Sequence, residues 1–224
     1  MAIVSSFISP LFETLFLWVR EDFVKQGIYW LGFWGQSAFY YSQIFFPILI
    51  SILVSISCQM EHQHKNWQRM VIMPISPYKL VLNKFMFLIC LTFLSELFFL
   101  ILFFIAGLVM RLPIEDFNFY ISSAVYGWIG SFSIISVQIF FSIKLKDFTT
   151  PIIIATICSI GGMLLLFINE NMLAFYPYTQ IVVGMRARKL IPFIENEEVE
   201  FIMINFLFVV VGLLFSGRQL SKIK

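Results

Sequence analysis

The sequence predicts an all-α, polytopic membrane protein with six transmembrane helices. Of its 224 residues, 60% are hydrophobic and only 12% are charged, whereas a soluble domain of this length carries about 25% charged residues. Several apolar runs also exceed the roughly 18 residues that indicate a membrane span. The runs are continuous, which argues against a β-barrel, because barrel strands alternate in segments of about ten residues.

Six apolar runs are expected to cross the membrane. The first, 1–18, is interrupted by a proline and by Glu13. An aromatic stretch at 29–34 follows it, and Trp and Tyr of this kind gather at the membrane–water interface. The second run, about 36–60, contains Pro47, which removes one helix hydrogen bond and is expected to kink the span. The remaining runs are about 85–110, 119–143, 151–168 and 201–217.

The segment before the sixth run is polar overall, but its part 171–185 is half apolar. This part is too broken to span the membrane, so we expect a re-entrant or interfacial helix, an external half-helix, before the last span. No internal repeat or low-complexity linker divides the chain. We therefore expect 1–224 to form a single transmembrane domain, without a cleavable signal peptide.

Six spans place both termini on one side of the membrane, and the Lys and Arg residues indicate which side. With the termini inside, the inner segments hold nine of the fifteen Lys/Arg residues. The positive-inside rule therefore favours cytoplasmic termini. The inner residues are Lys65, Arg69, Lys79, Lys84, Lys144, Lys146, Arg218, Lys222 and Lys224.

The sequence lacks the motifs of nucleotide and metal chemistry. No G-x-x-x-x-G-K-[ST] phosphate loop occurs, so work against a gradient would need an ion gradient or a partner ATPase. His62 and His64 would point to different faces of a helix, which favours solvated residues over a metal or pH-sensing site. The three cysteines are expected to be apolar packing residues. We expect no cofactor, no catalytic residues and no nucleic-acid partner.

Two acidic residues, Glu96 and Glu13, fall inside apolar runs. A charge in the middle of the bilayer is costly, so each should face the bundle interior or be protonated. One hypothesis is an intramembrane polar site for a proton or a substrate. The favoured alternative is a polar packing residue that meets Gln43, Gln59 or Gln138 on another helix.

An acidic run, 195–200, precedes the last span and contains four Glu residues. On the outer surface it could attract a cationic ligand. A solvated loop is the simpler interpretation, and we favour it.

The polar, basic stretch 61–84 separates the second and third runs. Taken as a helix, it places Trp67 and Met70 on one small apolar face, and Pro74 and Pro77 are expected to end that helix. One interpretation is an interfacial helix on anionic lipid. The other is a docking site for a cytosolic subunit, because Trp and Arg are enriched at interface hot spots.

The stretch also carries a sequence pattern: Glu61-x-x-x-x-Asn66-Trp67-x-x-Met70-x-x-x-Pro74-Ile-Ser76, followed by Lys79 and Lys84-Phe85. This pattern resembles the loop after the second span of ABC-type-2 permeases. It is most similar to the lantibiotic (bacteriocin) immunity and bacitracin-export subfamily. In that family the loop is the cytoplasmic coupling helix that contacts the ATPase.

The resemblance implies a function and a set of partners. The chain would be the non-catalytic permease subunit of an ATP-driven transporter that exports or expels a lantibiotic or another peptide antibiotic, for self-immunity or resistance. It would lie in the bacterial plasma membrane and pair with a second permease subunit, identical or different, and with a cytosolic ABC ATPase. The ATPase-coupling interface would comprise Glu61, Asn66, Trp67, Arg69, Met70 and Pro74.

Two further points concern the same family. Tyr176-Pro-Tyr178 resembles its external half-helix region. Family members usually begin with a basic amphipathic helix, yet no Lys or Arg precedes Arg20. Either the start lies upstream or this helix is absent.

Two other classes of protein stay open. An ion-coupled secondary carrier would use Glu96 and would not depend on ATP. An intramembrane enzyme or a structural protein has less support, because the spans contain no His/Asp/Glu metal constellation and no Ser/Lys dyad.

Overall fold

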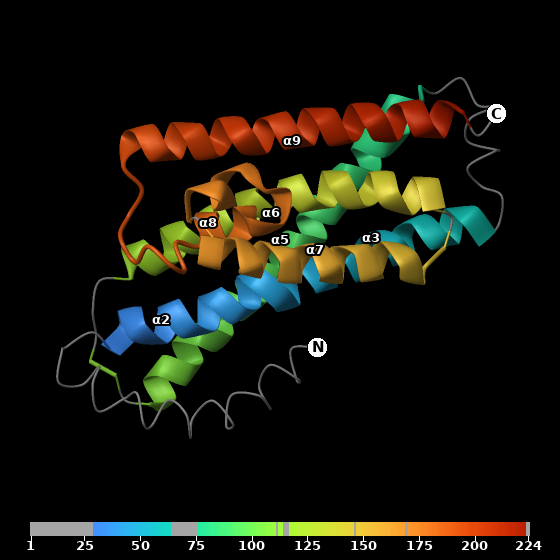
Figure 1. The fold of residues 1–224 in the computed structure, drawn as a ribbon. Coiled ribbons are helices and arrows are strands. Elements are labelled where there is room, and N and C mark those ends of the chain that lie inside the picture. The colour runs from blue at the N-terminus through green and yellow to red at the C-terminus, as the bar shows by residue number, and fades with distance from the viewer. Residues whose placement is uncertain are drawn as a thin grey trace.

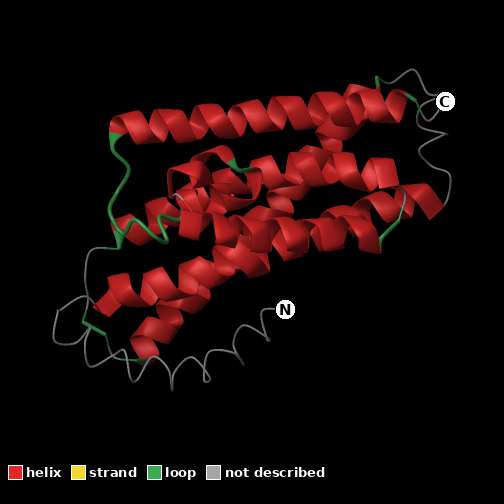
Figure 2. Cartoon of the chain, viewed as in Figure 1, coloured by secondary structure: helices red, strands yellow, loops and turns green. Residues whose placement is uncertain are grey.

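The computed structural model describes residues 29–63, 76–110, 112–113, 117–145, 147–168 and 170–222. Within these ranges every regular element is a helix (Figures 1 and 2). The elements are α2 (Tyr29–Tyr40), η1 (Tyr41–Phe45), α3 (Phe46–Gln63), α5 (Pro77–Val109), α6 (Asn118–Leu145), α7 (Thr149–Ile168), η2 (Glu170–Phe175), η3 (Pro177–Thr179), α8 (Gln180–Gly184) and α9 (Glu195–Ser221).

Among the described residues, four helical segments are long and apolar enough to cross a membrane, namely 29–62, 77–109, 118–145 and 195–221. α7 is a shorter apolar helix. These segments confirm the all-helical, membrane-spanning class. The first expected span and Glu13 lie outside the described residues, so the count of six spans and their topology stay predictions.

Two helices begin earlier than the apolar runs indicate. α5 begins at Pro77 instead of near 85, and Pro77 occupies its first turn, where a proline is well suited to start a helix. The helix that Pro74 and Pro77 are expected to end falls mainly in 64–75, outside the described residues, whereas Pro77 itself starts α5. α9 begins at Glu195, so the acidic run forms its first turns rather than a loop, because acidic side chains are favourable at the positive end of a helix dipole.

Trp30 and Trp34 lie inside a helix and are fully buried, rather than in an interfacial stretch before it. Both rings pack on Phe103 and Tyr120. The Trp34 indole N–H donates to the Met185 carbonyl at 2.9 Å. Burial is favourable here because the rings bury large apolar areas and the indole N–H still finds a partner.

The helix continues through Pro47, where a kink was expected. A π-helical turn, η1, ends two residues before the proline, and the Phe46 N–H donates to the Tyr41 carbonyl five residues back. The wider turn accommodates a residue that has no N–H of its own to donate. Such turns occur frequently at functional sites. In this turn Tyr41 stacks on Phe99, with ring centroids 4.0 Å apart.

α6 is the central helix and packs against α3, α5, α8 and α9. Small residues permit this, as is usual where membrane helices approach closely. A Cβ on Gly130 would lie 2.5 Å from the Gln180 carbonyl oxygen at the start of α8. On the side of α9, a Cβ on Gly212 would lie 2.7 Å from Ser136 Oγ.

Candidate functional site

The two helices that flank the expected coupling segment meet at one end of the bundle, where α3 ends and α5 begins (Figure 1). α3 ends at Gln63 and α5 begins at Pro77, so only 64–76 connects the two helices. Glu61 is described and lies in the last turn of α3. The other expected coupling residues, Asn66, Trp67, Arg69, Met70 and Pro74, lie outside the described residues.

Lys84 ties the two flanking helices together. Its Nζ donates to the Ser57 carbonyl at 2.6 Å and to Ser57 Oγ at 3.0 Å, and it lies 3.8 Å from Glu61 Oε1. The Lys84 and Glu61 side chains are 11% and 20% exposed, so the pair is shielded from solvent. A displacement of the connecting segment would therefore move the ends of α3 and α5 together.

α3 is also joined to the central helix at this end. His62 Nε2 lies 3.0 Å from the Ser142 carbonyl oxygen of α6. The histidine thus contacts a neighbouring helix backbone, which connects the C-terminal end of α3 to α6.

Glu96 lies far from this end, about 18 Å along the axis of α5 from Lys84. It is buried, with 3% of its surface exposed, and it faces Gly127 of α6. Two of the three suggested amide partners bind elsewhere: Gln43 Nε2 donates to the Ser159 carbonyl at 2.6 Å, and Gln138 Nε2 donates to the Tyr178 hydroxyl at 2.8 Å. The two predicted sites, coupling and intramembrane, are therefore separate.

The broken segment before the last span forms three short helical pieces, η2, η3 and α8. None is long enough to cross a membrane. Gln180 connects them to α9, because its Oε1 accepts from Asn205 Nδ2 at 2.9 Å while its Nε2 donates to the Ala174 carbonyl at 2.5 Å. Both side chains are buried. The segment is therefore held between α6 and α9.

Arg186 lies two residues after the end of α8 and fixes the connection to α9. Its backbone has φ 52°, a left-handed conformation common after a helix C-terminus but rare for a residue with a side chain. The guanidinium is 6% exposed and donates to Glu197 Oε2 at 2.8 Å and to the Ile191 carbonyl at 2.7 Å. It also lies 4.4 Å from the centre of the Phe193 ring. No sequence motif singled out Arg186, so sequence reasoning missed this role.

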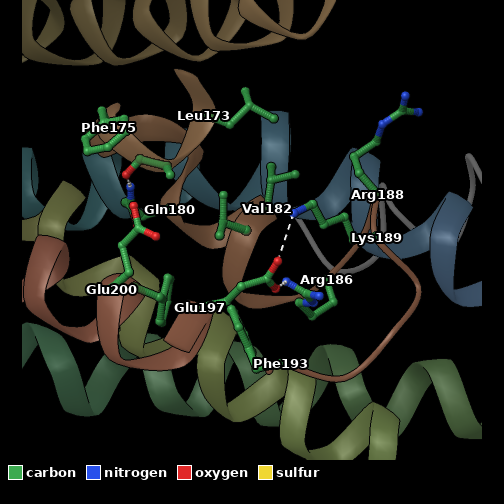
Figure 3. Close-up of a pocket in the computed structure, with 13 residues that line it drawn as sticks. Leu173, Phe175, Gln180, Val182, Arg186, Arg188, Lys189, Phe193, Glu197 and Glu200 are labelled. Atoms are coloured by element: carbon green, nitrogen blue, oxygen red, sulfur yellow. Dashed lines mark hydrogen bonds and ion pairs between the residues drawn. The ribbon is translucent and has the colours of Figure 1, made fainter. Parts of the chain in front are cut away.

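A pocket of about 300 Å³ opens between α8 and the start of α9 (Figure 3). Lys189 reaches Glu197 Oε1 at 3.1 Å, so Arg186 and Lys189 share one carboxylate. Glu200 lies on the other side of the pocket (Figure 3). The pocket lining combines these charges with aliphatic and aromatic side chains: Leu173, Ala174, Phe175, Gln180, Val182, Val183, Arg186, Arg188, Lys189, Phe193, Glu197, Glu200 and Phe201.

Comparison with known proteins identifies the family. The family model described as ABC-2 family transporter protein matches residues 1–162, a range that includes α2, α3, α5, α6 and most of α7. Comparisons with curated proteins and with solved structures gave no match. Because the matched range covers well over half of the 224 residues, the chain belongs to the ABC-2 family of membrane transporter proteins.

Proposed function

We propose that this ABC-2 permease is the non-catalytic, membrane-spanning subunit of a transporter driven by ATP hydrolysis on a separate ABC ATPase chain. Family membership supports the permease role. The observation that carries the coupling part is the contact of Lys84 with Glu61 and Ser57, directly beside the segment 64–76. Through this contact, a displacement of that segment would reach both α3 and α5.

The path continues from there into the bundle. α3 contacts α6 through His62 and Ser142, and α6 packs closely on α8 and α9. ATP-driven movement of 64–76 would therefore be passed by α6 to the pocket end, where Arg186 joins α8 to α9. A continuous chain of packed helices of this kind can carry a displacement between distant sites.

The ATPase would contact Glu61, Asn66, Trp67, Arg69, Met70 and Pro74. The test is co-purification of the ATPase with full-length permease that carries Trp67→Asp or Glu61→Arg. Both variants should lose the ATPase. Glu195→Arg reverses a charge at the opposite end and is the matched control. Undiminished association and transport in Trp67→Asp and Glu61→Arg would refute the coupling assignment.

The proposed cargo is a cationic, amphiphilic peptide antibiotic of the lantibiotic class, expelled from the membrane for self-immunity or resistance. The support is the resemblance of 61–84 to the subfamily that handles such peptides. The test is growth of cells that express permease and ATPase in the presence of a lanthionine-containing peptide. Protection should require both chains and should disappear with an ATPase variant that cannot hydrolyse ATP.

We further propose that both termini are cytoplasmic in a bacterial plasma membrane and that two permease chains, identical or different, form the transport path. The support is the excess of Lys and Arg at the end that holds Lys84, Lys144 and Arg218. Ser221→Cys and Glu195→Cys, introduced into a chain lacking its native cysteines, test the orientation. A membrane-impermeant maleimide added to whole cells should label only Glu195→Cys.

A second candidate function, an ion-coupled carrier, is favoured by one observation, the burial of Glu96 within a span. Under that alternative, Glu96→Gln abolishes transport and removal of the ATPase does not. Under the proposed function, transport persists in Glu96→Gln and stops when the ATPase is removed.

A further inference from the structure

We propose that the pocket between α8 and α9 binds the zwitterionic headgroup of a phospholipid that carries a free ammonium group. The inference concerns a lipid rather than the transported cargo, and it does not depend on ATP coupling. It stands on the distribution of charge in the pocket and on the apolar side chains at its rim.

One side of the pocket suits a phosphate. Arg186 and Lys189 lie 2.8 Å and 3.1 Å from the same Glu197 carboxylate, so two cations share one anion and one formal positive charge is uncompensated. Lys189 is 55% exposed, which leaves its ammonium group accessible. A phosphate placed beside Lys189 would complete the charge balance with charge-assisted hydrogen bonds.

The other side of the pocket suits an ammonium group. Glu200 is exposed, and within the described part of the chain no hydrogen bond or ion pair engages its carboxylate. The neighbouring acids differ, because Glu197 is paired and Glu198 accepts from the Tyr126 hydroxyl at 2.5 Å. Figure 3 places Glu200 and Lys189 on opposite sides of the pocket, with Val182 between them. A zwitterion carries a charge complementary to each side of the pocket.

The rim of the pocket suits a hydrocarbon tail. Phe175 lines the pocket and is 65% exposed, while Leu173 and Val182 form a buried apolar wall. α9, whose first turns line the pocket, is itself a membrane-spanning helix. An amphiphile at the membrane surface could thus place its headgroup among the charges and its tail along Phe175.

The same charges argue against a strongly cationic peptide as the occupant. The lining contains three basic side chains, Arg186, Arg188 and Lys189, but two acidic ones, Glu197 and Glu200. A ligand with a net positive charge would meet this excess of like charge. A zwitterion avoids that cost.

The test measures binding of short-chain lipids to the full-length chain in detergent, by native mass spectrometry. The probes are dihexanoyl phosphatidylethanolamine, dihexanoyl phosphatidylglycerol, which keeps the phosphate but lacks the ammonium, and O-phosphoethanolamine, which lacks the tail. The wild-type chain should prefer the ethanolamine lipid about fivefold, which corresponds to about 1 kcal/mol. Glu200→Gln should remove this preference, and Lys189→Gln should weaken binding of both lipids.

Glu195→Gln is the matched control, since Glu195 is exposed in the first turn of the same helix but does not line the pocket. An equal loss in Glu195→Gln and Glu200→Gln would overturn the proposal. So would equal affinity of the wild-type chain for the two lipids. Binding of O-phosphoethanolamine as tight as that of the lipid would identify a soluble ligand instead. Displacement of the lipid by a lysine-rich amphipathic peptide, with the peptide itself dependent on Glu200, would identify a peptide site.

Discussion

Arg186 Nη1 lies 2.8 Å from Glu197 Oε2, and this ion pair joins the end of α8 to the first turn of α9. Arg186 is nearly buried, at 6% exposure, whereas Glu197 is 35% exposed. The pair therefore closes the one long connection, 185–194, between the broken segment and the last span. It also forms one side of the pocket, so the stability of this corner and the shape of the pocket depend on the same two residues.

Removing the Arg186 side chain should destabilise the connection between α8 and α9. Arg186→Ala is expected to lower the free energy of unfolding by about 2–3 kcal/mol, because hydrogen bonds to a charged group are lost and buried acceptors are left unpaired. Lys189→Ala is the control and should cost less than about 1 kcal/mol, since its pair with Glu197 is solvent-exposed. Thermal unfolding of the purified chain in detergent measures both. Equal, small shifts would show that Arg186 does not hold the connection.

A methyl group between α6 and α8 should also be poorly tolerated. A Cβ on Gly130 would lie 2.5 Å from the backbone oxygen of Gln180, so the helices must separate. We expect Gly130→Ala to cost about 1–3 kcal/mol through overpacking. Gly161→Ala serves as the matched control, because the nearest atom, the Tyr176 hydroxyl oxygen, would be 3.9 Å away; it should be neutral or stabilise α7 by up to about 1 kcal/mol. Equal melting temperatures of the two variants would contradict the close packing of α6 on α8.

The Trp34 indole should stabilise the fold both through its hydrogen bond and through the apolar surface that it buries. Trp34→Phe keeps an aromatic ring but leaves the Met185 carbonyl, now 2.9 Å from the indole nitrogen, without this donor. The expected loss is about 1–2 kcal/mol. Trp34→Leu should cost more, because the contacts with Phe103 and Tyr120 are lost too. Chemical unfolding followed by circular dichroism would separate the two effects; equal losses would mean that the hydrogen bond contributes little.

Lys84 should matter for coupling more than for folding. Lys84→Met removes the contacts with Ser57 and Glu61, so ATPase movement would no longer shift α3 and α5 together. We expect the complex to continue to hydrolyse ATP while the amount of cargo transported per ATP falls about tenfold. A tenfold change corresponds to about 1.4 kcal/mol, the expected energy of the lost contact. Lys79→Met, an exposed lysine earlier on the same helix, should leave that ratio unchanged. An unaltered ratio in Lys84→Met would remove the contact from the coupling path.

The interiors of the spans were predictable from the sequence, and their ends were less so. α6, expected at about 119–143, spans Asn118–Leu145, because the polar residues that bound its apolar run also lie at the two ends of the helix. α5 begins eight residues earlier than its apolar run. Hydropathy counted Lys84 as part of a loop, whereas the fold provides it with partners on α3.

Contacts between residues far apart in the sequence could not be predicted from any local sequence pattern. The segment 171–185 was recognised as too broken to span, since a proline and polar residues interrupt it. Its attachment through Arg186 and Glu197 was not recognised, because no spacing rule links a residue after a half-helix to an acid in the next span. Likewise, an aromatic stretch before an apolar run is typical of a membrane interface. The hydrogen-bond acceptor of the buried Trp34 indole, the Met185 carbonyl, is 151 residues away in the sequence.

Energy is proposed to enter this permease through the segment 64–76, and one measurement tests that most directly. Permease and ABC ATPase are reconstituted together in liposomes, and ATP-dependent movement of a cationic amphipathic peptide is followed for the wild type, Trp67→Asp and Glu195→Gln. The expected result is transport by the wild type and Glu195→Gln, with loss of both transport and bound ATPase in Trp67→Asp. Full transport and ATPase association in Trp67→Asp, or wild-type transport that persists without ATP, would contradict the proposed route.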